Sequence, residues 1–265
     1  MKILISLFFA LLVSGAGFLF RALDFSGFAA ATFVGAAIFL GAGLPGAAVL
    51  IFFFVLGSAL SRLPSEVVAP EQKARSLDSA RDVSRDWRQV LANGLWPALL
   101  ALGYGVRQDE AYYLAFVSSL AAAGADTASG EVGVRWAKRT FSILNFRSVP
   151  PGVSGGISLT GTLAGLAGAV LVALVGVGPK GWDFHLSFKS TLLVAAMGFM
   201  GMLFDSLLGA LVQAKYRCTV CRSAVEVPRH CGKPAERTSG LAVLDNDGVN
   251  FLATMFGAAL GLVLF

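Results

Sequence analysis

The sequence predicts an all-α fold, a polytopic transmembrane helical bundle of about eight membrane segments joined by cytoplasmic loops. Three observations support this prediction. The chain of 265 residues is 56% hydrophobic and only 14% charged, whereas an ordinary soluble domain is about 25% charged. Several apolar runs approach the roughly 20 residues that a helix needs to cross a bilayer. The 31 glycines would weaken soluble helices, but in a membrane they let helices approach closely.

Eight apolar stretches are the candidate membrane segments. In chain order they are Ile3–Phe20, Phe25–Leu40, Pro45–Leu60, Val90–Tyr104, Ala111–Ala125, Ile157–Val177, Thr191–Gln213 and Val249–Phe265. The fourth and fifth are short for a full span, so we expect them to be tilted, broken or partly re-entrant. Met1–Phe20 could be a secretory signal, but no clear small-x-small cleavage site precedes a polar region, which favours a first membrane helix.

The segments and loops divide the chain into three parts. Residues 1–61 form N-terminal transmembrane segments, and residues 62–89 form a charged cytoplasmic loop. Residues 90–265 form a transmembrane bundle that carries the candidate catalytic residues and includes a cytoplasmic Cys/His hairpin at 215–247.

The basic residues predict the orientation in the membrane. Arg21 and the loops Arg62–Arg88, Arg135–Arg147 and Lys215–Arg237 hold 17 of the 21 Lys and Arg residues. Positive charge is retained in the cytoplasm, so we expect these loops inside, both termini outside, and a location in the inner cell membrane. The loops also explain the net charge of +5, and no nucleic-acid partner is expected.

Carboxylates at or inside apolar helices are costly and usually mark function. Asp126 ends the fifth segment, Asp205 lies within the seventh, and Asp245 and Asp247 stand just before the eighth. Clustered carboxylate and amide oxygens are the ligands that Mg²⁺ prefers. Helix capping is the alternative for most of them, but it fails for Asp205, which is surrounded by apolar sequence.

A turn rich in Gly, Ser and Thr, over residues 150–162, leads directly into the sixth segment. Backbone N–H groups in such a turn can bind an anion, and the helix N-terminus adds favourable partial charge. No Gly-Lys-Ser/Thr follows, so this is not a Walker A motif. The compatible alternative is a loop followed by a small-residue packing face, Gly161-x-x-x-Gly165.

All three cysteines of the chain lie in one loop with one of its two histidines, as Cys218-x-x-Cys221 followed by His230-Cys231. Four such ligands suit a tetrahedral, structural Zn²⁺ site, which would pin the loop between the last two segments. The alternative is a set of reduced cytosolic thiols. The charged residues of Arg62–Arg88 are either a solvated amphipathic helix or cations that reach an anionic ligand. Asn93 is either a helix cap or part of the acidic site.

Five motifs together resemble those of a known family of membrane proteins, which includes the chloroplast phytyl-phosphate kinase of plants and the animal transmembrane protein 19. The motifs are Gln89–Gly94, Ala125–Gly133, Gly155–Thr162, Phe204–Gly209 and Asp245–Phe251. The resemblance covers roughly residues 60–265. It implies a CTP-dependent and Mg²⁺-dependent kinase that converts phytyl phosphate, or a related isoprenoid monophosphate, to the diphosphate.

The resemblance also implies roles for residues of this chain. Asp126, Glu131 and Asp205 are expected to hold Mg²⁺ at a catalytic site that includes Asn93, with Asp245 and Asp247 as further ligands. Nucleotide and lipid phosphates are expected to bind these residues: Lys73, Arg75, Arg81, Ser154, Gly155, Gly156, Ser158, Thr160, Gly161, Asn246 and Asn250. The expected partners are CTP or another nucleotide, an isoprenoid phosphate lipid and membrane lipids. The oligomeric state is left open, with a homodimer as one alternative.

Two other functions remain open from the sequence. A transporter or flippase of a phosphorylated or lipid substrate would also use broken helices and intramembrane carboxylates. No inverted repeat is evident, and the acidic groups cluster at one face, which favours an enzyme. A zinc-stabilised assembly factor without catalysis would leave the acidic cluster unexplained.

Overall fold

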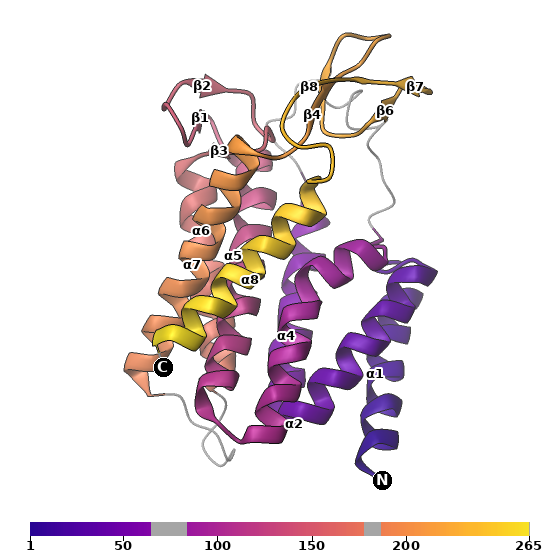
Figure 1. Cartoon of the computed structure of the whole chain (residues 1–265), viewed down its shortest axis with the longest axis vertical. Coiled ribbons are helices and arrows are strands. Elements are labelled where there is room, and N and C mark those ends of the chain that lie inside the picture. Colours follow the sequence, from indigo (N-terminus) through magenta and orange to yellow (C-terminus); the bar gives the residue numbers. More distant parts are fainter. Residues whose placement is uncertain (65–83, 178–186, 265) are drawn as a thin grey trace.

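A computed structural model describes residues 1–64, 84–177 and 187–264 of the protein. Long helices lie side by side as a bundle, with short strands over one end and the start of α1 and the end of α8 at the other (Figure 1). The helices are α1 (Lys2–Leu19), α2 (Phe25–Ser61), α4 (Trp87–Arg107), α5 (Glu110–Trp136), α6 (Leu159–Val177), α7 (Phe188–Leu211) and α8 (Asn246–Leu264).

Helix α1 turns small residues inward and large apolar residues outward. Its buried residues are Ser6, Ala10, Ser14 and Gly17. Its exposed residues include Leu4, Phe8 and Leu12. The small face packs on α2, where Ser14 Oγ lies 2.7 Å from Thr32 Oγ1. A helix in water buries its large apolar residues, whereas a membrane helix shows them to lipid and packs through small ones. The pattern of α1 is that of a membrane helix.

Helix α2 folds back on itself at Gly43. A straight helix of its 37 residues would be about 55 Å long, yet Arg62 Nη2, just after its end, donates to Phe20 O, just before its start, at 2.6 Å. Gly43 has φ 61° and ψ −153°, and Pro45 follows it. The second and third predicted segments are therefore the two arms of one hairpin, and both outer ends of α2 lie at the end of the bundle that carries the strands.

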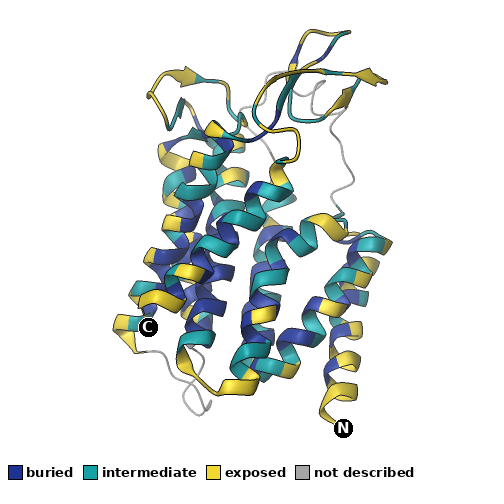
Figure 2. Cartoon of the chain, in the orientation of Figure 1, coloured by how far each residue is buried: buried dark blue, intermediate teal, exposed yellow. Residues whose placement is uncertain are grey.

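Helix α5 is the centre of the bundle. It packs against α2, α4, α6, α7 and α8, and every residue from Tyr113 to Ala125 is buried (Figure 2). The fourth and fifth segments are longer than predicted, because α4 has 21 residues and α5 has 27, and both are continuous helices rather than broken ones. Only Gln108 and Asp109 separate the two helices.

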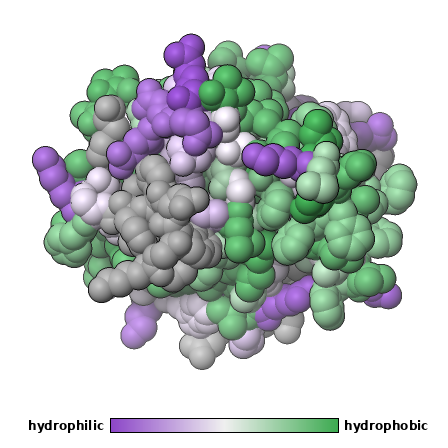
Figure 3. Space-filling view, turned by 90° about the horizontal axis from the view of Figure 1, so that it is seen from below, coloured by the Kyte–Doolittle hydropathy of each residue, from purple (hydrophilic) through white to green (hydrophobic). Residues whose placement is uncertain are grey.

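Within the described residues, five helices are long and apolar enough to cross a membrane: α1, α2, residues 159–176 of α6, α7 and α8. Eight membrane segments are thus not established, although each predicted segment is helical over most of its length. Seen from the end opposite the strands, much of the outline of the molecule is hydrophobic (Figure 3). The central α5 is shielded by its neighbours, so it needs fewer apolar residues than a helix that faces lipid.

The all-α prediction is incomplete, because two loops form small antiparallel sheets. In the first, β1 (Thr140–Ser142) lies between β2 (Ser148–Val149) and β3 (Gly156–Ile157). The second loop forms two sheets: β4 (Lys215–Arg217) lies between β5 (Ala224–Val225) and β8 (Glu236–Ser239), and β6 (Arg229–His230) pairs with β7 (Lys233–Pro234) as a separate two-stranded sheet. These sheets lie over the same end of the bundle, and the loops that form them contain most of the basic segments Arg135–Arg147 and Lys215–Arg237, on which the predicted cytoplasmic side partly rests.

Candidate functional site

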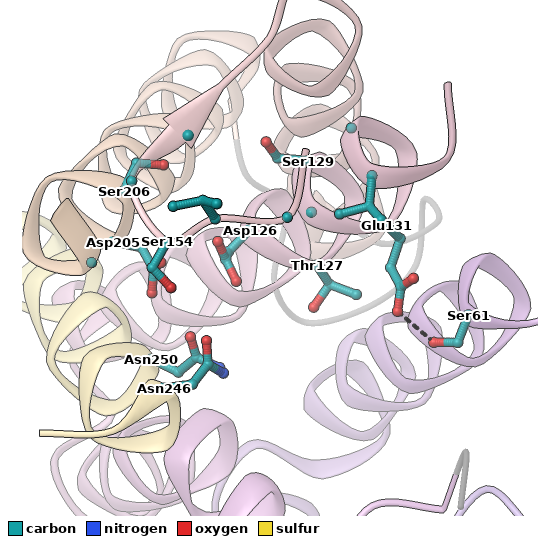
Figure 4. Close-up of a pocket in the computed structure, with 18 of the residues that line it drawn as sticks. Ser61, Asp126, Thr127, Ser129, Glu131, Ser154, Asp205, Ser206, Asn246 and Asn250 are labelled. Carbon is teal, nitrogen blue, oxygen red and sulfur yellow. Dashed lines mark hydrogen bonds between the residues drawn. The ribbon is translucent and has the colours of Figure 1, made fainter. Parts of the chain in front are cut away.

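A cavity of about 650 Å³ lies among the ends of α2, α4, α5, α7 and α8 and the turn between β2 and α6 (Figure 4). Its size is typical of a site for a small molecule. The structure brings eleven predicted site residues to its wall: Asn93, Asp126, Glu131, Ser154, Gly155, Gly156, Ser158, Asp205, Asn246, Asp247 and Asn250. Thr160, Gly161 and Asp245 do not line it. Lys73, Arg75 and Arg81 lie outside the described residues.

The side chains of Asp126 and Asp205 lie near each other at the α5–α7 contact (Figure 4). The packing of the two helices explains this placement. A Cβ on Gly201 would lie 2.4 Å from Ala122 Cβ, so glycine lets α7 approach α5 closely, and the two aspartates follow one turn later on each helix. Asp205 Oδ2 is buried and has no hydrogen-bond partner among the described residues.

Two adjacent carboxylates repel each other unless a cation or a proton lies between them. The pair offers the carboxylate oxygens that Mg²⁺ prefers, and a bound Mg²⁺ would supply the positive charge that offsets their repulsion. Among the described residues, however, the five predicted acidic ligands do not gather at one point, since no group of three carboxylates is close enough to share an ion. Asp126 and Asp205 are the two that fit.

Glu131 binds protein groups at the edge of the cavity. Its carboxylate accepts from Ser61 Oγ at 2.8 Å and forms an ion pair with Arg135, which also donates to the carbonyls of Ser61 and Leu63. These contacts tie the end of α2 to α5. In Figure 4 the Glu131 side chain points toward Ser61 and away from Asp126. The structure thus shows Glu131 joining two helices, apart from the expected ligand set.

The turn after β2 presents Ser154, Gly155 and Gly156 to the cavity. It already holds an anion, because Glu226 Oε1 accepts from Ser154 N at 3.0 Å and from Ser154 Oγ at 2.5 Å. Ser158 caps α6 by accepting from Gly161 N at 3.0 Å. Gly161 packs α6 on α5, with its Cβ position 2.9 Å from Ser129 O. The turn therefore contacts an anion, and the adjacent small-residue face packs α6 against α5.

Gly155→Ala is expected to destabilise the protein by about 1–3 kcal/mol, the usual cost of forcing a side chain into left-handed backbone. Gly155 has φ 81°, and an added Cβ would collide with Ala210 of α7. Thermal unfolding in detergent measures the effect. The matched control is Gly130→Ala, which meets nothing within 4 Å and should be neutral or slightly stabilising. Equal unfolding temperatures for Gly155→Ala and the unsubstituted protein would contradict the expected strain.

The first turn of α8 forms the wall opposite the aspartate pair. Asn246, Asp247 and Asn250 line the cavity, and Figure 4 shows Asn246 and Asn250 across from Asp126 and Asp205. Asp245 instead caps α8 by accepting from Gly248 N at 3.0 Å. It also pairs with Arg88 at 2.6 Å on the surface. The capping alternative is therefore correct for Asp245, and its proposed role as a metal ligand lacks support.

Arg85 is the cation that the sequence did not single out. Its guanidinium is partly buried at the cavity wall, over the rings of Phe53 and Phe54 at 5.9 and 5.4 Å from their centres. Its backbone is fixed by Asp24 N, which donates to Arg85 O at 3.2 Å. Burial lowers the pKa of Arg85, and the nearby charge of Glu131 opposes this effect. A guanidinium held this way is suited to binding an anion.

A second, apolar cavity of about 90 Å³ adjoins the first. It lies between α1, both arms of α2 and α4, and its lining includes Ala31, Val34 and Leu50. Phe53, Arg85, Gln89 and Asn93 line both cavities. A charged group in the large cavity and an apolar chain in the small one could therefore meet at Arg85.

Several polar residues of the cavity were missed as site candidates: Ser61, Ser84, Arg85, Gln89, Thr127, Ser129, Arg135, Ser206 and Gln213. Thr127, Ser129, Ser206 and Gln89 lie inside the motifs that carried the resemblance, and that position was the available signal. The others follow only from the way the helices meet.

The cysteines and the histidine of the loop 215–239 form a separate cluster, away from the large cavity. One ligand atom from each of Cys218, Cys221, His230 and Cys231 lies within 4.8 Å of all the others. The backbone N–H of Cys221 donates to Cys218 Sγ at 3.4 Å, which lowers the pKa of the Cys218 thiol. The structure thus assembles the four predicted ligands.

Comparison with known proteins places these features in a wider group. The family model described as integral membrane protein DUF92 matches residues 8–258. An uncharacterized membrane protein of Methanocaldococcus jannaschii is 30% identical over 245 residues, or 92% of this chain and 87% of that protein. Protein PGR of Arabidopsis thaliana is 30% identical over 257 residues, covering 89% and 86%. Protein VTE6, chloroplastic, also of Arabidopsis, is 32% identical over 169 residues, covering 62% and 50%. No solved structure matches significantly.

Proposed function

The chain belongs to the DUF92 family of integral membrane proteins, and we propose that it is a CTP-dependent, Mg²⁺-dependent kinase of a prenyl monophosphate. The observation that carries the proposal is the junction of the two cavities at Arg85. A polar cavity with a carboxylate pair adjoins an apolar cavity between helices that face lipid. A lipid phosphate has this same division into a charged head and an apolar tail.

The reaction transfers the γ-phosphoryl group of CTP to the prenyl phosphate. A terminal oxygen of the prenyl phosphate attacks the γ-phosphorus, the bond to the β–γ bridging oxygen breaks, and CDP leaves with that electron pair. The nucleophile is already an anion, so no strong general base is required. Catalysis then consists of positioning and charge stabilisation. Mg²⁺, bound at Asp126 and Asp205, would neutralise charge on the transferred group.

The residues around the pair would orient the nucleotide. The N-termini of α6 and α8 are both close to the cavity, and a helix N-terminus favours phosphate. Asn246 and Asn250 offer amide donors from α8, opposite the aspartates. The Ser154 turn binds a carboxylate in the protein as described, which supports its affinity for anions; a nucleotide phosphate would compete with Glu226 there.

The acceptor lipid would bind at the junction. Its phosphate would meet the Arg85 guanidinium from the polar side, and the first part of its tail would enter the apolar cavity. The cavity is small, so the remainder of the tail would extend into the lipid beside α1 and α2. This arrangement points the terminal phosphate oxygens toward Asp126 and Asp205.

Ala31→Phe should narrow the apolar cavity and raise the KM for prenyl phosphates about tenfold, the order expected for a steric misfit in an apolar site. Ala31 lines this cavity, whereas Ala29, two residues away on the same arm, is exposed. Ala29→Phe is therefore the matched control. Initial rates with phytyl phosphate and with the short, five-carbon acceptor isopentenyl phosphate measure the effect. A KM change of the same size for both acceptors, or for both variants, would rule out this tail site.

The function is tested with purified protein in lipid nanodiscs, Mg²⁺ and γ-labelled CTP. Phytyl, farnesyl and geranylgeranyl phosphate serve as acceptors, and ATP and GTP replace CTP in parallel reactions. We expect labelled diphosphate from CTP with at least one acceptor. Folded protein that forms no diphosphate in any reaction would refute the kinase.

The same experiment separates the kinase from a transporter or flippase. Movement of prenyl phosphate across reconstituted vesicles without product formation would favour the transporter. Against it, the break in α2 at Gly43 lies near the far end of α4, where Gly41 contacts Ala101. The break in α2 therefore lies away from the charged cavity, whereas in many transporters the break of a discontinuous helix forms part of the substrate site.

A further inference from the structure

The hairpin of residues 215–239 carries a cluster of soft ligands that the kinase chemistry does not use. Cys218 and Cys221 lie on the turn between β4 and β5, and His230 and Cys231 lie at the turn between β6 and β7. His230 Nδ1 is 3.5 Å from Cys221 Sγ and 3.2 Å from Cys231 Sγ. No disulfide joins the three cysteines, so all three sulfurs are available as ligands.

The backbone of both turns directs the sulfurs inward. Cys218 Sγ accepts from Val220 N at 3.3 Å and from Cys221 N at 3.4 Å, and such bonds stabilise a thiolate. Cys231 has φ 51° and Gly232 has φ 72°. The left-handed conformation of Cys231 turns its side chain to the same side as that of His230, which adjacent residues in an extended strand could not achieve. The two turns thus form halves of one site.

We propose that Cys218, Cys221, His230 and Cys231 bind one structural Zn²⁺ ion, and that this ion keeps the hairpin of residues 215–239 docked on the wall of the large cavity. Three thiolates and one imidazole are a ligand set of tetrahedral zinc. Four protein ligands leave no open position for substrate or water. The ion therefore holds the fold of the hairpin and takes no part in phosphoryl transfer.

The hairpin reaches the cavity through Glu226, the residue after β5. Its two carboxylate oxygens bind different elements: Oε1 accepts from Ser154 N and Oγ, and Oε2 accepts from Gln213 Nε2 at 2.9 Å. Lys215 Nζ adds bonds to Ser154 O at 3.3 Å and to Ala210 O at 3.5 Å. A short loop with few apolar contacts cannot hold these groups in place alone, and a metal supplies the missing constraint. These bonds of Glu226 and Lys215 to the Ser154 turn form a clamp, and its relevance to catalysis rests on the proposed kinase function. The metal site does not depend on that function.

Metal analysis of protein purified without chelators is the first test. We expect about one zinc per chain, and a Co²⁺-substituted sample should show thiolate-to-cobalt charge-transfer absorption. Cys221→Ser should lose most of the zinc. Thr219→Ala, a substitution between the two cysteines that removes only a bond to Pro234 O, should retain it. Less than about half an equivalent of zinc in folded, unsubstituted protein, or one equivalent of iron instead, overturns the zinc assignment.

Hydrogen exchange of the turn 152–156 is the second test, and it requires no enzyme activity. Chelation of zinc should speed exchange in the hairpin and also in this turn, because the Ser154 N–H loses its acceptor. Glu226→Gln should speed exchange in the turn while the zinc content stays unchanged. Unchanged exchange of the turn after zinc removal overturns the clamp, whatever the outcome of the kinase assay.

Discussion

Asp126→Asn is expected to lower turnover of the prenyl phosphate by at least about a thousandfold. The metal in such a site stabilises the transition state by several kcal/mol, and each 1.36 kcal/mol is a factor of ten in rate. The substitution keeps the size of the side chain and removes its charge. It also ends the repulsion with Asp205 across the α5–α7 contact, so the fold should be at least as stable as before.

The control for this prediction is Glu110→Gln, which makes the same change of charge on the same helix. Glu110 is exposed in the first turn of α5, at the far end of the bundle from the cavity. Single-turnover rates with saturating CTP should be unchanged in this control. Asp126→Asn protein that is folded and turns over within tenfold of the unsubstituted protein would show that the pair does not hold the catalytic metal.

Arg85→Gln is expected to lower kcat/KM for the acceptor about a hundredfold, because a hydrogen bond to a charged group contributes roughly 1.5–3 kcal/mol. The loss should appear mainly as a higher KM for prenyl phosphate, with the KM for CTP little changed. Arg85→Lys keeps the charge but loses the two-pronged geometry, so it should restore part of the activity. Steady-state kinetics with each substrate varied in turn measures this pattern.

Arg88→Gln serves as the control for Arg85. Arg88 lies three residues later but pairs with Asp245 on the surface, where ion pairs contribute little. Its removal should change neither KM by more than about twofold. A larger rise in the KM for CTP than for the lipid in Arg85→Gln would place Arg85 at the nucleotide and would refute the junction as the site of the acceptor phosphate.

The two central aspartates could be predicted because each is a charge in an apolar helix, where lipid or protein would surround it. Composition alone identified the membrane protein, and the spacing of the cysteines identified the outer cluster. Charged residues inside an apolar helix, a largely apolar composition and clustered cysteines are each rare in proteins that lack the corresponding site, membrane or metal. The charge of a side chain and its preference for a metal are properties of the residue type, so they can be predicted from the sequence without knowing the fold.

The parts that failed depend on contacts between distant segments. Glu131 carries the same charge as Asp126, and only its contacts with Ser61 and Arg135 in the folded protein show that it joins two helices. Arg85 stands in a loop of mixed charge, and nothing in that pattern distinguishes a cation at a cavity wall from a solvated one. Strands of two or three residues have no measurable period. The length of α5 was underestimated because its polar turn at Thr127–Ser129 resembles the end of a helix.

The reversal of α2 at Gly43 also constrains how the chain enters the bilayer. A helical hairpin that enters and leaves the membrane on the same side does not change the side on which the later loops lie. The two arms have to insert together, because the backbone at the turn is exposed unless both arms and the end of α4 surround it. If α2 crossed the membrane as one straight helix instead, the chain after residue 62 would continue on the opposite side of the membrane from Arg21.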